Sequence, residues 1–135
     1  MITAVDTSVL IDVFGADVRF GQSSAVALRR CLNEGAVVAC AAVWAETRAA
    51  FASDEAFVQA MNALEIGYSL TTEQSAVLAG RTCKKYRAAG GKRDRMIADF
   101  LIGAHAACQC ARLLTRDRGY YQRYFTGLHV LNPSA

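Results

Sequence analysis

Four short apolar runs alternate with longer segments of helical periodicity along this chain, and this alternation constrains the fold more than any other feature. The runs are Ile2–Val5, Ala36–Cys40, Arg112–Leu114 and Leu128–Leu131. Runs of this length are typical of buried strands. Because parallel neighbouring strands need a crossover between them, usually a helix, the pattern predicts an α/β fold with a mostly parallel central sheet.

Helix signals fill the intervals between these runs. Ser53 is predicted to cap a helix that Gly67 ends, and Thr71 with Gln74 resembles a capping box that opens another helix. Asp99 is the single charged residue of the segment 96–111, so that helix is expected in the middle of the domain. The predicted helices cover residues 9–14, 23–34, 42–51, 53–66, 71–89, 96–111 and 120–125.

The chain of 135 residues is expected to form one domain, residues 1–135. Hydrophobic residues make up 53% and charged residues 20%, which is typical of a compact soluble protein. The five cysteines, an odd number without a C-x-x-C motif, favour reduced thiols. The first residues lack the pattern of a signal peptide, and the apolar stretches fall short of the ~20 residues that span a bilayer. We therefore expect a cytoplasmic protein with no membrane partner.

Four of the 12 acidic residues stand where apolar segments turn into polar loops or helix starts: Asp6, Glu46, Asp99 and Asp117. Asp6 and Asp117 follow two predicted strands, and Glu46 lies soon after a third. In parallel α/β sheets the ligand site lies beyond the carboxyl ends of the strands, so convergence is expected. Gathered carboxylates repel one another unless a hard divalent cation holds them together. The pattern therefore indicates metal-dependent phosphodiester chemistry.

Each of these acids also has an ordinary structural interpretation. Asp6 and Asp117 stand where helix N-caps are expected. Glu46 is compatible with a surface acid, and Asp99 lies four residues after Arg95, a spacing that allows an ion pair along the helix. All four acids fall at strand ends or on buried helix faces, which favours the shared site.

Two further acids and three hydroxyl residues lie close to these positions. Asp12 follows Asp6 on the first predicted helix and is compatible with facing the site, whereas Asp94 lies within a basic run that it is expected to neutralise. Thr7, Ser8 and Thr115 flank two of the acids. Such hydroxyls orient carboxylates or metal-bound water, and they also cap helices, so both interpretations stay open.

Basic residues are concentrated in the C-terminal half of the chain. The net charge is +3, but 11 of the 15 lysines and arginines lie at or beyond Arg81. This distribution is compatible with a solvated helix face or with a surface that follows a phosphate backbone. If the second interpretation holds, the candidate RNA-binding residues are Lys92, Arg93, Arg95 and Arg116.

Other acid-bearing or nucleotide-binding α/β folds fit the sequence poorly. A receiver domain usually has paired acids after the first strand and a lysine after the last, and neither is present. A haloacid-dehalogenase-type phosphatase requires D-x-D, where this chain has Asp6-Thr7-Ser8. The G-x-G-x-x-G motif of a dinucleotide site is absent after the first strand.

The acidic motifs together resemble those of the PIN-domain family, and within it the VapC-type toxins of toxin–antitoxin pairs. The resemblance spans essentially the whole chain. Asp99 rather than Asp94 matches the third motif, because the D-x-L-I-x-A pattern begins there. The matching segments are Val5-Asp6-Thr7-Ser8-Val9-Leu10-Ile11-Asp12, Val43-Trp44-Ala45-Glu46, Ile97-Ala98-Asp99-Phe100-Leu101-Ile102-Gly103-Ala104-His105-Ala106, Leu113-Leu114-Thr115-Arg116-Asp117 and Val130-Leu131-Asn132-Pro133.

This resemblance implies a three-layer α/β/α fold around a mostly parallel sheet of four to five strands. It also implies an endoribonuclease that depends on Mg²⁺ or Mn²⁺ and hydrolyses RNA with a metal-activated water. Asp6 and Asp99 would hold the metal most directly, and Glu46 and Asp117 would complete the site. The family further implies a homodimer and a cognate antitoxin protein. A non-toxin PIN nuclease in RNA processing and a catalytically inert PIN-like binding module remain as alternatives.

Overall fold

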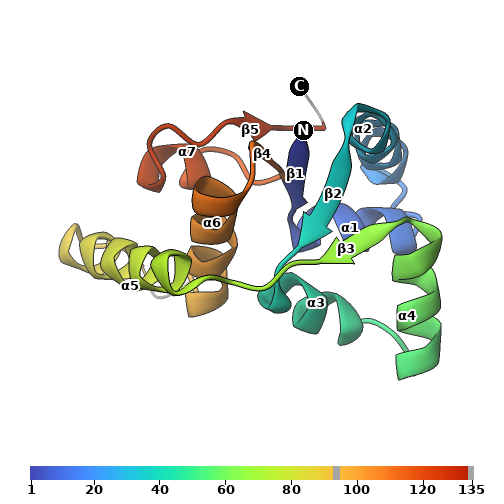
Figure 1. Ribbon diagram of the computed structural model, residues 1–135, viewed down its shortest axis with the longest axis horizontal. Coiled ribbons are helices and arrows are strands. Elements are labelled where there is room, and N and C mark those ends of the chain that lie inside the picture. The colour runs from blue at the N-terminus through green and yellow to red at the C-terminus, as the bar shows by residue number, and fades with distance from the viewer. Residues whose placement is uncertain (93–94, 134–135) are drawn as a thin grey trace.

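A five-stranded parallel sheet forms the centre of the computed structural model, which describes residues 1–92 and 95–133 (Figure 1). The strand order is β3–β2–β1–β4–β5, and all four pairings are parallel. The expectation of a mostly parallel sheet of four to five strands is confirmed. The strands are β1 (Ile2–Val5), β2 (Ala36–Ala39), β3 (Ile66–Tyr68), β4 (Arg112–Leu114) and β5 (Val130–Leu131).

Helices cover both faces of this sheet and give the expected three-layer α/β/α fold. In Figure 1, α5, α6 and α7 lie on one side of the sheet, and α1 and α2 lie on the other. The helices in the described part of the chain are α1 (Thr7–Phe14), α2 (Gly21–Glu34), α3 (Ala41–Arg48), α4 (Asp54–Ala63), α5 (Glu73–Ala88), α6 (Ile97–Gln109) and α7 (Tyr120–Tyr124).

The strand order reverses at β1, and this reversal fixes where a ligand site can form. The chain first adds β2 and β3 on one side of β1, and α5 and α6 then carry it back to β4 on the other side. In open parallel sheets, ligands bind beyond the carboxyl ends of the strands at such a switch point. The carboxyl ends of β1 and β4 lie next to each other, since Val5 pairs with Leu114.

Two local predictions were wrong. Gly67 was expected to end a helix, but it lies in β3, where Val37 of β2 pairs with Ile66 and Ala39 pairs with Tyr68. The N-cap of α5 is Thr72 rather than Thr71, since the amide of Ser75 donates to the Thr72 hydroxyl at 3.2 Å. The Ser53 cap is confirmed by a 3.1 Å hydrogen bond from the Ala56 amide.

Helix α6 lies deep in the domain, as its apolar sequence predicted. Phe100, Ile102 and Ala104 are buried, and α6 contacts both β1 and β4. A Cβ atom at Gly103 would lie 2.3 Å from the ring of Phe125, so the glycine allows α6 to approach that ring closely. This packing brings the first turn of α6, with Asp99, to the switch point. Within the described residues, no helix combines the length and apolar character that crossing a membrane requires.

Candidate active site

Asp6 directly follows β1 and lies in the crevice at the switch point. Its side chain is 7% exposed. One carboxylate oxygen accepts a 2.8 Å hydrogen bond from the Thr7 amide, and through this bond Asp6 caps the start of α1. The N-cap interpretation therefore holds for Asp6 together with its place in the site.

Hydroxyl groups tie the segment after β4 to the start of α1. Thr115 donates to Asp6 at 2.6 Å and accepts from the Asp117 amide at 3.0 Å. Ser8 donates to the same Asp6 oxygen at 3.2 Å and accepts from the Arg116 amide at 3.3 Å. These hydrogen bonds hold the segments that follow β1 and β4 next to each other around the Asp6 carboxylate, although the two segments lie far apart in the sequence.

The four acids singled out in the sequence line one pocket of about 300 Å³. Asp6 comes from the end of β1, Glu46 from the second turn of α3, Asp99 from the first turn of α6, and Asp117 from the segment after β4. We call this the acid pocket. Its lining residues are Asp6, Thr7, Ser8, Glu46, Asp99, Arg116 and Asp117.

Burial makes the ionised form of Asp6 costly. Loss of solvent raises the pKa of this carboxyl to about 6, against an ordinary value of 3.8, although the hydrogen bonds from Thr115, Thr7 and Ser8 act in the opposite direction. The nearby charge of Asp99 raises the pKa further. A cation in the pocket would relieve both the burial cost and the repulsion.

Each of the other three carboxylates of the pocket accepts at least one hydrogen bond from a neighbouring group. Glu46 accepts from the Thr7 hydroxyl at 2.7 Å. Asp99 accepts from the amide of Met96 at 3.0 Å and so caps its own helix. Asp117 pairs with Arg95 at 2.9 Å and accepts from the Tyr120 amide at 3.3 Å.

The donor chemistry of the pocket fits a hard divalent cation. All four acids offer oxygen ligands, which Mg²⁺ and Mn²⁺ prefer. Among the described residues, the second carboxylate oxygen of Asp99 and that of Glu46 accept no hydrogen bond. The described part of the chain contains no three acidic, histidine or cysteine side chains already gathered closely enough to hold a metal.

Asp12 lies outside the acid pocket in a different environment. It is 2% exposed, and its carboxylate receives two hydrogen bonds from the Arg116 guanidinium, at 2.8 and 3.0 Å. Ser24 of α2 donates to it at 2.8 Å. The Arg116 guanidinium also lies over the Phe20 ring, 4.1 Å from its centroid. The sequence offered no signal for this pair, because its members lie 104 positions apart.

The predicted orienting hydroxyls all contact acids of the pocket, whereas the basic candidates are divided. Thr7, Ser8 and Thr115 each donate to Glu46 or Asp6. Arg95 pairs with Asp117, not with Asp99 as the helical spacing allowed. Lys92 is exposed in the segment that follows α5, and Arg116 lines the acid pocket. Arg93 and Asp94 lie outside the described residues.

Comparison with known proteins places this arrangement in a family. The family model described as PIN domain matches residues 3–125. None of the curated proteins compared with the chain matches it.

Solved structures share the fold at low sequence identity. VapBC2 from Rickettsia felis, bound to a DNA fragment from its promoter, has a TM-score of 0.77 at 16% identity, with 98% of both chains covered. VapBC-1 from nontypeable Haemophilus influenzae has a TM-score of 0.76 at 21% identity over 100% of both chains. The Sarcin-Ricin loop cleaving toxin VapC20 from Mycobacterium tuberculosis has a TM-score of 0.64 at 15% identity, covering 94% of this chain and 98% of that chain.

Proposed function

The chain belongs to the PIN-domain family, as its motifs predicted, and from that premise we propose that it is a metal-dependent endoribonuclease. The observation that carries the proposal is the acid pocket, in which four carboxylates from four separate elements line one hollow at the switch point of the sheet. We propose that the whole chain, residues 1–135, acts as a single nuclease domain in the cytoplasm.

Asp6 and Asp99 are the proposed primary ligands for Mg²⁺ or Mn²⁺, with Glu46 and Asp117 completing the site. A bound divalent cation would supply Lewis acidity, lowering the pKa of a water and offsetting the charge of the phosphodiester. The protein contributes orientation. The Thr115 and Ser8 hydroxyls hold the Asp6 carboxylate in place by hydrogen bonds. Arg116 also lines the pocket and is a proposed contact for the anionic RNA backbone, although its guanidinium is already bound to Asp12.

We further propose that this nuclease is the toxin of a toxin–antitoxin pair, with a cognate antitoxin protein and a homodimeric state. The support is the fold shared with VapBC complexes and with a toxin that cleaves the Sarcin-Ricin loop. Growth arrest on expression, relieved by co-expression of a neighbouring gene product, is the expected result. Expression without effect on growth, by a protein that does cleave RNA, would favour a non-toxin nuclease in RNA processing.

The direct test is cleavage of total RNA by the purified protein in Mg²⁺, Mn²⁺ or EDTA. We expect cleavage that needs the metal and falls by about a thousandfold in Asp6→Asn and in Asp99→Asn, because several kcal/mol of charge stabilisation is lost. Glu55→Gln, which changes an exposed acid of α4, is the matched control and is expected to retain full activity. Full activity in both pocket variants, or cleavage that EDTA does not reduce, would contradict the proposal. Folded wild-type protein that binds no metal would instead favour an inert PIN-like module.

A further inference from the structure

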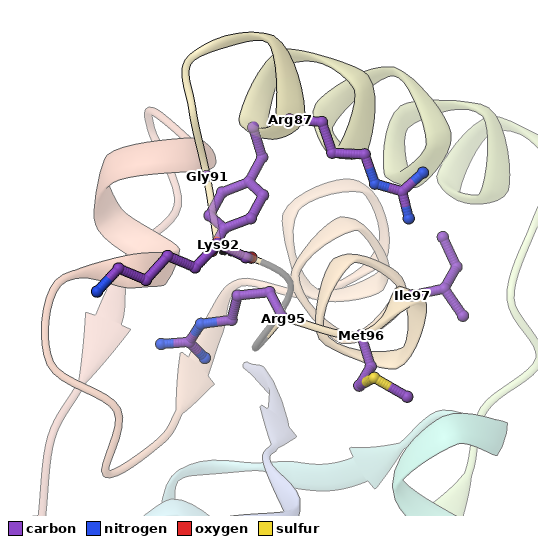
Figure 2. Close-up of a pocket in the computed structure, with 7 residues that line it drawn as sticks. Arg87, Gly91, Lys92, Arg95, Met96 and Ile97 are labelled. Atoms are coloured by element: carbon purple, nitrogen blue, oxygen red, sulfur yellow. Dashed lines mark hydrogen bonds between the residues drawn. The ribbon is translucent and has the colours of Figure 1, made fainter.

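A second hollow lies beside the acid pocket, between the end of α5, the segment before α6, and α7. It has a volume of about 490 Å³, and its polar lining consists of Lys92, Arg95, Arg118 and Arg123 with the tyrosines 86, 120 and 124. We call it the basic hollow. An adjoining hollow of about 660 Å³ shares Lys92 and Arg95 and extends to Arg87. Figure 2 shows the side chains of Lys92 and Arg95 extending to one side and that of Arg87 to the other.

Three of the four basic residues that line the basic hollow have no ionic partner among the described residues. None of the described residues that line either part of it is acidic. Lys92, Arg118 and Arg123 are exposed, and no described acid forms an ion pair with any of them. Clustered like charges repel, so an anion with several negative groups would bind here favourably.

Arg95 joins the basic hollow to the acid pocket. Its guanidinium lines the basic hollow and donates to Asp117, which lines the acid pocket, at 2.9 Å. The same guanidinium lies over the Tyr120 ring, 4.1 Å from its centroid, which restricts its position. A polyanion with one group at the acid pocket would therefore pass Arg95 on its way into the basic hollow.

Arg116, the other arginine at the acid pocket, has less charge to offer, because its guanidinium already forms two hydrogen bonds with the buried Asp12.

We infer that the basic hollow binds backbone phosphates of single-stranded RNA next to the phosphodiester that lies in the acid pocket. The inference rests on the proposed ribonuclease function. Lys92, Arg118 and Arg123 contact the phosphates, and Arg95 sits between the two sites. Contacts of this kind fix the register of the strand and carry no base sequence information. The adjacency to the acid pocket favours RNA over an acidic peptide, for which that adjacency would serve no purpose.

The test is fluorescence anisotropy of a short fluorescein-labelled single-stranded RNA with the full-length protein in EDTA. Arg118→Ala and Arg123→Ala are each expected to weaken binding roughly fivefold, and the double variant more strongly. The slope of log K against log salt concentration should become shallower by about 0.7 for each phosphate contact removed. The double lysine variant, Arg118→Lys with Arg123→Lys, keeps the charge and should retain most of the affinity. Arg29→Ala changes an exposed arginine of α2, a helix on the opposite side of the sheet from α5 and α7 in Figure 1; it is the matched control and should bind as the wild type does.

The possible results separate this inference from the ribonuclease proposal, because binding is measured without cleavage. Weakened RNA binding in the double alanine variant, with unchanged binding in Arg29→Ala, supports the basic hollow even for a protein that cleaves no RNA. Unchanged RNA binding in the double alanine variant overturns the inference even for an active nuclease. A labelled polyglutamate peptide serves as the comparison anion. If its binding depends on Arg118 and Arg123 while RNA binding does not, the hollow is a peptide site and the inference is wrong.

Discussion

Asp6 and Asp12 are two buried carboxylates on the same short stretch of chain, and the structure treats their charges in opposite ways. Asp12 is met by a guanidinium through two hydrogen bonds and by the Ser24 hydroxyl. Asp6 is met by two hydroxyls and an amide, with a further carboxylate, Asp99, close enough to raise its pKa.

The difference separates a carboxylate that supports the fold from one that is available to a ligand. The charge of Asp12 is compensated inside the protein by Arg116 and Ser24. These contacts also join α1, α2 and the segment after β4. The charge of Asp6 is only partly compensated, so the metal-free protein carries an electrostatic cost at the switch point of its sheet. That cost is what a divalent cation would remove.

The largest expected effect on stability comes from removing the compensated carboxylate. Asp12→Ala leaves the Arg116 guanidinium without its partner and should lower the free energy of unfolding by about 3 kcal/mol, since breaking a buried pair costs more than the pair contributes. Urea unfolding measures this change. The matched control is Asp54→Ala, which breaks an exposed pair with Arg48 and should cost only about 0.5 kcal/mol. Equal losses in the two variants would show that Asp12 has no special structural role.

Removing the uncompensated carboxylate should have the opposite sign. Because the pKa of Asp6 is raised in the folded state, the folded protein binds a proton more tightly than the unfolded chain does. The metal-free wild type should therefore gain stability as the pH falls through about 6 toward 3.8, relative to Asp6→Asn. Above that window, Asp6→Asn should be the more stable protein by on the order of 2 kcal/mol. Urea unfolding in EDTA across this pH range gives the two curves, and parallel curves would contradict the assigned environment of Asp6.

A smaller effect should follow from weakening the hydroxyl support of Asp6. Thr115→Val removes the 2.6 Å hydrogen bond that stabilises the ionised carboxylate. The pKa of Asp6 should then rise by roughly one further unit. Carboxyl-carbon NMR titration of the metal-free protein measures this pKa. Thr126→Val, at an exposed threonine, is the control and should leave it unchanged. A pKa that falls in Thr115→Val would mean that the hydroxyl does not stabilise the charged form.

The smallest predicted effect concerns Asp117, which is the acid of the pocket that pairs with an arginine among the described residues. Asp117 resembles Asp12 in pairing with a guanidinium, but both members of the Arg95–Asp117 pair are partly exposed. Arg95→Ala should free Asp117 and tighten Mn²⁺ binding about threefold, the scale of an exposed ion pair. Arg95→Lys should change the affinity less. Weaker Mn²⁺ binding in Arg95→Ala, measured by calorimetry, would show that Arg95 supports the site instead of competing for it.

The sequence predicted the parts of the fold that have strong local signals. All four predicted strands follow from apolar runs within two residues of their observed bounds, and the helix 96–111 follows from its nearly continuous apolar character. Strand β3 was missed because it is three residues long and contains Gly67, so that its formation depends on pairing with β2.

The candidate site could be predicted because topology, rather than local sequence, brings its residues together. Asp6 and Asp117 end adjacent strands, so the rule for parallel sheets was sufficient to expect their convergence. The partners of the charged groups could not be predicted. Arg95 lies four residues from Asp99 in sequence, yet it pairs with Asp117, and Asp12 pairs with an arginine beyond β4. Such pairs depend on how distant side chains pack against one another, and this packing leaves no periodic pattern in the sequence.

Binding of Mn²⁺ in solution tests the distinction between Asp6 and Asp12 most directly. Isothermal titration calorimetry at a pH above the raised pKa of Asp6 would compare the wild type, Asp6→Asn and Asp12→Asn, each first shown to be folded by circular dichroism. The account predicts that the wild type and Asp12→Asn bind Mn²⁺, whereas Asp6→Asn has lost most of the affinity. Equal binding by Asp6→Asn and the wild type, or loss of binding only in Asp12→Asn, would contradict the assignment of the acid pocket as the metal site.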